Sequence, residues 1–283
     1  MKSIRRNRLL LLFLLPFALL VLGFELLPLV GMTVDSLHDG DTGQWSWVQY
    51  ATALGSKFYL QALQNSVLIS FCSSLVGILV AIVAAYSITR LSPGTRDIIL
   101  MLSNMTSNFA GVPLAFAYMI LLGNNGIFTL LLHKWGWDVF ASFNLYSWIG
   151  LTLVYVYFQI PLAILLLYPA YYGIQRQWKE AALLLGASPL RFWLHIGIPV
   201  ILPGVVGTFS ILFANAMGAY ATAYALVGSN YNLLAVRIGA LVSGDVVSQP
   251  QLASALAVIL AVTMVGAMWI NERMMRRVRR DLQ

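Results

Sequence analysis

Charged residues are scarce in this sequence. Asp, Glu, Lys and Arg make up only 10% of the 283 residues, and 60% are hydrophobic. Soluble globular domains carry about 25% charged residues, so this shortage excludes that class and indicates an integral membrane protein. Cysteine is nearly absent as well, because Cys72 is the only one. An intrachain disulfide and a cysteine metal cluster are therefore excluded.

Several catalytic motifs are also missing. A phosphate-binding loop needs Gly-Lys-Ser/Thr, and no lysine of this chain follows a glycine. His-Glu-x-x-His and Gly-x-Ser-x-Gly do not occur, and the histidines are scattered at His38, His133 and His195. We therefore expect no enzyme and no metal site in this chain. Any ATP that drives its function must be bound by another subunit.

Long apolar runs are what the sequence has in plenty. A run of about 20 apolar residues is long enough to span a membrane as a helix. We predict an all-α, polytopic membrane protein in which residues 1–283 form a single transmembrane domain. Its six spans are expected at about 9–30, 61–88, 97–122, 145–168, 200–227 and 251–271. The apolar stretch 127–132 is too short to cross, and we expect a short interfacial helix there.

The first run follows a basic stretch, as a signal peptide does. It is longer than the apolar region of a signal peptide, and no small-x-small cleavage site follows it. We therefore expect an uncleaved first span, kinked at Pro16.

The basic residues predict the orientation of the spans. Of the 17 Lys and Arg residues, all but Lys57, Lys134 and Arg237 fall on one side of the six spans. By the positive-inside rule, that side is cytoplasmic and holds both termini. The net charge of +7 is thus explained by topology and by contact with membrane lipid, and not by nucleic acid.

The segment from 171 to 199 interrupts the apolar runs. Helix-forming residues lead to Gly186, which suits the left-handed position after a helix end, and Ser188-Pro189 is typical of an N-cap followed by proline. We predict two short helices with a hinge at Gly186, the second ending at Pro199. The second has Leu190, Trp193 and Leu194 on one side and Arg191 and His195 on the other. From the residues alone, it either lies on the membrane surface or docks in a partner's groove.

The spacing within this segment carries a resemblance. Glu180-Ala181-Ala182 is followed after three residues by Gly186, and after nine more by Ile196-x-Ile198-Pro199. This pattern resembles the signature loop of permease subunits in bacterial binding-protein-dependent ATP-binding cassette importers, with isoleucine at Ile198 where the family usually has leucine. We call residues 171–199 the signature loop. The resemblance implies the type I importer permease fold and a loop that couples to an ATPase, through Glu180, Ala181, Ala182, Gly186, Ser188, Arg191, Ile196 and Pro199.

The resemblance also implies partners. The chain is expected in the bacterial inner membrane with two cytoplasmic ATPase subunits, which would bind ATP and Mg, so that no cofactor binds this chain directly. A second six-span permease subunit is expected beside it, as a heterodimer, with a periplasmic solute-binding protein. The stretches 108–113 and 251–257 resemble permeases for polyamines, aminoethylphosphonate and ferric ion. Asp35, Asp39 and Asp41 outnumber Lys57 on the predicted outer loop and favour a cation such as spermidine or putrescine.

Polar residues within the spans are candidates for a translocation path. A polar group in hydrocarbon is costly without a partner. The residues we consider are Asn104, Thr106, Asn108, Gln159, Asn215 and Tyr220. Each could instead form an interhelical packing hydrogen bond, worth about 0.6 kcal/mol. For the small residues Gly77, Ala81 and Ala85, and for Ala214 and Gly218, we expect close helix packing.

An ATP-independent secondary transporter is the alternative class. Such proteins usually place ionisable residues or broken helices at mid-membrane. Apart from Asp97 at the start of the third span, Glu25 is the only acid within a predicted span, and it lies off-centre. The sequence therefore favours the importer.

Overall fold

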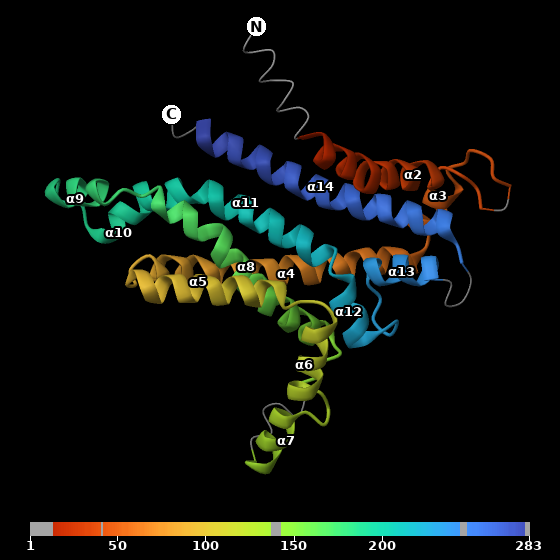
Figure 1. Ribbon diagram of the computed structural model, residues 1–283, viewed down its shortest axis with the longest axis horizontal. Helices are drawn as coiled ribbons and strands as arrows, with labels where there is room; N and C mark the ends of the chain where they lie inside the picture. The colour runs from red at the N-terminus through yellow and green to blue at the C-terminus, as the bar shows by residue number, and fades with distance from the viewer. Residues whose placement is uncertain (1–13, 41, 137–142, 244–247, 281–283) are drawn as a thin grey trace, which may run out of the picture. The chain divides into compact units, whose positions relative to one another are not determined.

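The computed structural model describes residues 14–40, 42–136, 143–243 and 248–280 (Figure 1). The start of the first predicted span at 9–13 and Asp41 lie outside these residues. The described chain is helical, with one isolated β-bridge between His38 and Trp45, so the all-α prediction is confirmed. Six of its helical stretches are long and apolar enough to cross a membrane: Leu14–Asp35, Lys57–Ile88, Val112–Lys134, Trp148–Tyr172, Pro189–Met217 and Pro250–Arg273.

By its internal contacts, the described chain forms two compact units. One holds the residues up to Leu60 together with Arg237–Ala261, and the other holds Gln61–Val236 and the residues after Ala261. The first unit contains a π-turn, η1 (Leu22–Leu26), then α2 (Leu27–Asp35) and α3 (Val48–Gly55). In the connection between α2 and α3, Ser36 Oγ and Tyr50 OH form a hydrogen bond of 2.7 Å. The ring centroids of His38 and Trp45 lie 4.5 Å apart there. Glu25 is exposed there.

The second unit is built around α8 (Trp148–Tyr172), which packs against α5 (Pro93–Asn108) and α11 (Ile198–Met217). Leu151, Val154 and Phe158 of α8 lie in one buried cluster, and Ala163 and Leu167 lie in another. Helix α4 (Lys57–Ile88) contributes to both clusters. This unit also holds α6 (Val112–Leu122), α7 (Ile127–Lys134) and α12 (Tyr220–Val227). Helices α13 (Leu234–Ser243) and α14 (Pro250–Arg280) each have residues in both units.

The third and fifth predicted spans are not continuous, which corrects the expectation. The stretch 97–122 is divided into α5 and α6 at Phe109–Gly111, where Gly111 has φ +78°. Pro113 stands in the first turn of α6 and has no N–H to continue a helix from α5. The stretch 200–227 ends as α11 at Met217 and resumes as α12 at Tyr220. Figure 1 shows α6 turned away from the line of α5, and α12 from that of α11.

Apolar composition did not distinguish a straight span from a broken one. The third stretch able to span is therefore 112–134, which joins α6 to α7, and not 97–122. The short helix expected at 127–132 is present as α7. The first, second, fourth and sixth spans lie within about five residues of the predicted bounds, whereas the fifth is Pro189–Met217 and not 200–227.

Candidate functional site

The first helix of the signature loop is α9 (Arg176–Leu184). The chain bends just after it, at Gly186. The Gly186 N–H donates to Leu183 O at 3.0 Å, and the Ala187 N–H donates to Ala182 O at 2.9 Å. These two bonds, with the φ of +78° at Gly186, form a Schellman motif. A side chain at 186 meets no neighbour, so the requirement for glycine comes from the backbone conformation alone. The predicted hinge is where the structure has it.

The second helix starts as predicted but does not end as predicted. Ser188 is the N-cap of α10 (Pro189–Phe192), and its Oγ accepts from the Arg191 N–H at 3.3 Å. The helix then passes through a π-turn, η3 (Trp193–Gly197), into α11, so that the expectation of an end at Pro199 is wrong. In η3 the Ile198 N–H donates to Trp193 O, five residues back. Such a wider turn accommodates Pro199, which has no N–H and whose ring would crowd a regular turn.

The outward side of the loop is apolar. Leu184 and Leu185 are 89% and 88% exposed at the hinge, and Leu190 and Leu194 are exposed on the second helix. Together we call these four side chains the leucine surface. Exposed leucines gathered at one bend are typical of a protein-binding site.

The resemblance-derived coupling residues divide between the two sides of the loop. Glu180, Ala181, Ser188 and Arg191 are exposed. Ala182 is buried, and Ile196 and Pro199 are half-buried. Only one alanine of the pair is thus open to a close approach from outside. The other packs the loop against the rest of its unit.

The inward side of the loop borders a pocket of about 560 Å³. From the loop, Lys179, Glu180 and Leu183 line it, and so do Phe192 and Trp193. From the ends of α4 and α8 it is lined by Tyr86, Thr89, Arg90, Tyr171, Ile174 and Gln175. The loop is therefore separated from the transmembrane helices by an opening on one side of Trp193.

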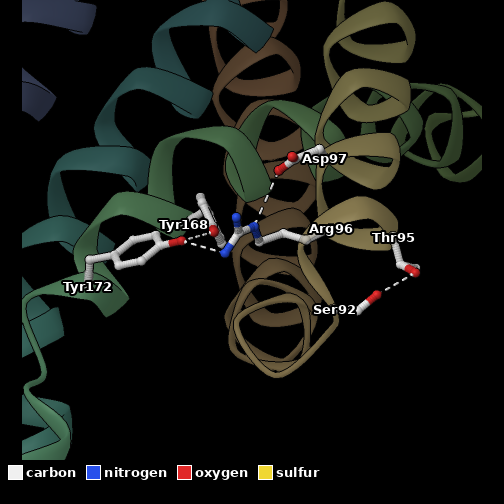
Figure 2. A network of polar contacts seen from close by, with 6 residues as sticks. All are labelled: Ser92, Thr95, Arg96, Asp97, Tyr168 and Tyr172. Carbon is white, nitrogen blue, oxygen red and sulfur yellow. Dashed lines mark hydrogen bonds and ion pairs between the residues drawn. The ribbon is translucent and has the colours of Figure 1, made fainter.

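A polar network fixes the ends of α5 and α8 (Figure 2). Arg96 Nη1 donates to Tyr172 OH at 3.1 Å, and Arg96 Nε lies 3.3 Å from Asp97 Oδ1. The hydrogen bond to Asp97 raises the pKa of the Arg96 guanidinium, which therefore stays charged. Tyr168 and Tyr172 share a hydrogen bond through their hydroxyls. The network ties α5 to α8 at the side from which the signature loop departs.

The six polar residues predicted for a path lie in four helices, of which α5, α11 and α12 hold all but Gln159. Asn104, Thr106 and Asn108 lie at the end of α5, where Asn108 Nδ2 donates to Asn104 O at 2.8 Å. Asn215 is exposed near the end of α11. Tyr220 opens α12 and stacks on Tyr224, with ring centroids 5.3 Å apart.

Gln159 differs from the other five because it is fully buried. Its Nε2 donates to Ser74 Oγ at 3.0 Å and to Ser73 Oγ at 3.4 Å, so it joins α8 to α4. Gly77 lies beneath it, and a Cβ at that glycine would come within 3.1 Å of Gln159 Cβ. This is a packing position and not the lining of an opening.

The two helix breaks are joined to each other. The Gly111 N–H, at the break before α6, donates to Thr222 Oγ1 of α12 at 2.8 Å. Tyr155 OH of α8 donates to Ala219 O, at the break before α12, at 3.2 Å. From the sequence, Thr222 was one of several polar residues of the fifth span, and its contact with Gly111 was not predicted. Its signal was a polar residue between small ones in an apolar helix.

No cluster of three or more His, Cys, Asp or Glu side chains able to hold a metal occurs among the described residues. The other groups that sequence reasoning missed are Tyr86 and Tyr171, which meet Trp193. Both tyrosines stand at the end of an apolar run, a position typical of a membrane interface, and this pattern could have identified them in the sequence.

Comparison with known proteins gives a consistent family. Residues 73–280 match the profile of the family described as "Binding-protein-dependent transport system inner membrane component". The ferric transport system permease protein FbpB of Actinobacillus pleuropneumoniae is 24% identical over 268 residues, which cover 92% of this chain and 38% of that protein. The spermidine/putrescine permease PotB of Haemophilus influenzae is 24% identical over 66% of this chain and 65% of its own. The sulfate permease CysW of Escherichia coli is 25% identical over 77% and 71%.

Solved structures agree on the fold. A chain of a bacterial ABC transporter involved in alginate import has a TM-score of 0.71 at 19% identity, covering 98% of both chains. A chain of the methionine transporter MetNI has a TM-score of 0.56 at 17% identity, covering 77% of this chain and 95% of the other. The type I importer permease fold expected from the signature loop is confirmed.

Proposed function

The chain belongs to the family of binding-protein-dependent transport system inner membrane components, and we propose that it is the permease subunit of an ATP-driven importer. Its helices would form part of the solute pathway. Two cytoplasmic ATPase subunits would bind ATP and Mg and dock on the signature loop, and both termini would lie on that same side of the membrane. The work of moving solute would come from alternating access, with ATP binding closing the ATPases and opening the path outward.

The observation that carries this proposal is the bend at Gly186 with the leucine surface around it. The Schellman motif fixes the direction of α10 relative to α9, and the hinge leucines are almost fully exposed. A rigid bend that presents apolar side chains is suited to a cleft in a partner. Glu180 and Arg191, both exposed beside it, would add charge contacts at the rim.

A solute path is proposed along the two helix breaks. Asn104, Thr106 and Asn108 precede one break, and Asn215 and Tyr220 flank the other. The Gly111 to Thr222 bond brings these breaks together. Irregular backbone at membrane depth is tolerated where it borders a cavity or is buried in protein, and transporters use it to bind solutes. We leave Gln159 out of the path because it is fully buried between α4 and α8.

For the solute we propose a small polar cation, of the polyamine class. The acidic residues Asp35 and Asp39 on the predicted outer loop favour a cation. The relative PotB is named as a permease for spermidine and putrescine. Ferric ion and aminoethylphosphonate are the alternatives. The relatives FbpB and CysW are named for ferric ion and sulfate, so the uptake test must include both. A solute-binding protein would deliver the solute, as the alginate-bound periplasmic protein accompanies one structure of similar fold.

A second permease subunit is proposed to complete the path, as a heterodimer. Gly207 of α11 and Gly218 at its C-cap are exposed and leave room for another helix to approach. Small residues are typical of contacts between helices in membranes.

The docking part of the proposal is tested by co-purification. The chain is expressed with the ATPase subunit encoded beside it and purified through a tag on the chain. Gly186→Ala forces a side chain into φ +78°, a cost of about 1–2 kcal/mol, and should lower the recovered ATPase at least fivefold. Gly43→Ala is the matched control, because Gly43 has φ +65° and no neighbour within 4 Å. Equal recovery for both variants would remove the loop from the docking site.

A further inference from the structure

Trp193, which the sequence grouped on one side with Leu190 and Leu194, differs from these leucines in burial. It stands in η3, between the loop helix α10 and the transmembrane helix α11. Leu190 and Leu194 on either side of it are exposed, whereas Trp193 is half-buried and lines the inward pocket. One residue of the loop is thereby directed at the transmembrane helices.

Three aromatic rings from three parts of the chain meet there. The Trp193 ring lies edge-on to Tyr86 of α4, with centroids 4.9 Å apart at 88°, and 6.5 Å from Tyr171 of α8 at 63°. Tyr86 and Tyr171 are themselves 5.8 Å apart. Edge-to-face contacts of 4.5–7 Å are the favoured geometry of aromatic pairs. We call these three residues the aromatic triad.

Each ring of the triad is held from behind. Tyr171 OH donates to Ile82 O of α4 at 2.7 Å, and the Arg90 guanidinium lies 4.4 Å from the centre of the Tyr86 ring and donates to its hydroxyl. The Trp193 indole lies over Gly197, where any Cβ would clash with its Cε3 and Cζ3 atoms. These contacts fix the position of each ring beside the pocket, so a displacement of Trp193 is passed to Tyr86 and Tyr171 through the ring contacts.

The pocket makes the triad the direct route. Helix α9 carries Glu180, yet the pocket lies between its Lys179, Glu180 and Leu183 and the α4 end at Thr89 and Arg90. The opening thus lies between this side of α9 and the end of α4. The neighbouring Phe192 is buried, and its ring centroid lies 6.0 Å from that of Trp193. These two residues therefore form the packed contact between the loop and the transmembrane helices.

We infer that Trp193 is a positioning residue that transmits movement of the signature loop to α4 and α8 through Tyr86 and Tyr171. The inference rests on the proposed function, since it names the contact by which ATPase movement would reach the solute path. It separates two roles within the loop. The leucine surface binds the ATPase, and the triad passes the movement on.

The test measures solute moved per ATP hydrolysed, in proteoliposomes holding the whole transporter with its binding protein. Tyr86→Leu removes the α4 ring and leaves the signature loop unaltered, and Trp193→Ala removes the loop's ring. Each should retain ATPase recovery on purification and lower solute moved per ATP about fivefold or more. Trp193→Phe keeps an aromatic edge and should restore at least half of the wild-type ratio.

Two further variants sharpen the result. Phe71→Leu is the matched control, because Phe71 of α4 forms an edge contact with Phe209 of α11, with centroids 5.6 Å apart at 78°, away from the loop. It should keep the wild-type ratio. The double variant of Trp193→Ala with Tyr86→Leu should be no worse than the stronger single one, since both break the same contact.

Two outcomes overturn the inference while leaving the proposed function intact. One is a wild-type value of solute moved per ATP in Tyr86→Leu. If Trp193→Ala fails to assemble, the result for Tyr86→Leu alone decides. The other is a strictly multiplicative loss in the double variant. A wild-type complex without ATP-dependent uptake would instead overturn the proposed function, so the two failures are distinguishable.

Discussion

Gly111 donates its backbone N–H to Thr222 Oγ1 at 2.8 Å, and this bond joins the two helix breaks of the chain. Thr222 is buried, so its hydroxyl is shielded from water and lipid. Gly111 has a φ of +78°, at which the chain leaves the direction of α5 before α6 begins. The bond thus gives a partner to a donor that the break would otherwise leave unpaired.

Removing that acceptor should destabilise the chain. Thr222→Val keeps the shape of the side chain but leaves the Gly111 N–H without a partner, at a cost of about 1–3 kcal/mol in the free energy of unfolding. Thr222→Ser keeps the hydroxyl and should cost less than half as much. Denaturant unfolding in detergent, followed by tryptophan fluorescence, measures both. A larger loss for Thr222→Ser than for Thr222→Val would mean that the methyl group, and not the hydrogen bond, holds the breaks together.

Close packing of α11 on α8 makes a second prediction. A Cβ at Gly204 would come within 2.9 Å of Ala170 Cβ, which cannot rotate away. Gly204→Ala should therefore cost about 1–3 kcal/mol of unfolding free energy. Gly207→Ala, one turn later on the same helix, meets nothing within 4 Å and should be neutral or gain up to about 1 kcal/mol from helix propensity. The opposite ranking would show that α8 and α11 pack differently.

The proposed path makes a third prediction. Asn108→Leu and Asn215→Leu should each lower the uptake rate about tenfold while complex recovery stays normal, because a polar lining is replaced by an apolar one. Asn104→Leu should act in the same direction, since its Oδ1 and carbonyl oxygen both accept from Asn108.

Gln159→Met is the control for the path. It removes a fully buried amide whose Oε1 has no protein partner, and it should keep uptake normal with a stability change under about 1.5 kcal/mol. Normal uptake in the asparagine variants would assign them to packing, and a loss confined to Gln159→Met would place the path between α4 and α8.

The leucine surface makes a fourth prediction. Truncating Leu184 and Leu185 together to alanine removes two almost fully exposed side chains, so the free energy of unfolding should stay within about 0.5 kcal/mol of wild type. Affinity for the ATPase subunit should fall about tenfold or more if these residues are central to the interface. Microscale thermophoresis with the purified ATPase measures this affinity. Unchanged affinity would place the contact on Glu180 and Arg191 instead.

Local chemistry predicted the hinge of the signature loop, and it did so for physical reasons. A glycine after a run of helix formers and a Ser-Pro start depend only on neighbouring residues, and the structure has the Schellman turn at Gly186 and the cap at Ser188. The end expected at Pro199 was wrong because the π-turn that accommodates it is a feature of the whole helix. The same limit applies to the aromatic triad, which unites residues 86, 171 and 193 only through the fold.

Hydropathy predicted six spans but not the two breaks within them. Gly111 and Pro113 were visible at the first break, yet the apolar run continues through them. Gly218, which we predicted as a packing residue, is also the C-cap of α11. Broken helices are usual in secondary transporters, and the described residues contain these two breaks, so the scarcity of acids in the spans no longer decides against that class. The family match and the signature loop now carry the choice between the two classes.

ATP dependence of uptake tests the central claim most directly. The chain is reconstituted into proteoliposomes with its ATPase subunits, the second permease subunit and the binding protein, and uptake of labelled spermidine, ferric ion and sulfate is followed with and without ATP on the ATPase side. We expect uptake of one solute only when ATP and the binding protein are both present, and none by the chain alone. Uptake by the chain alone, without ATP and driven by an ion gradient, would contradict the account and establish a secondary transporter.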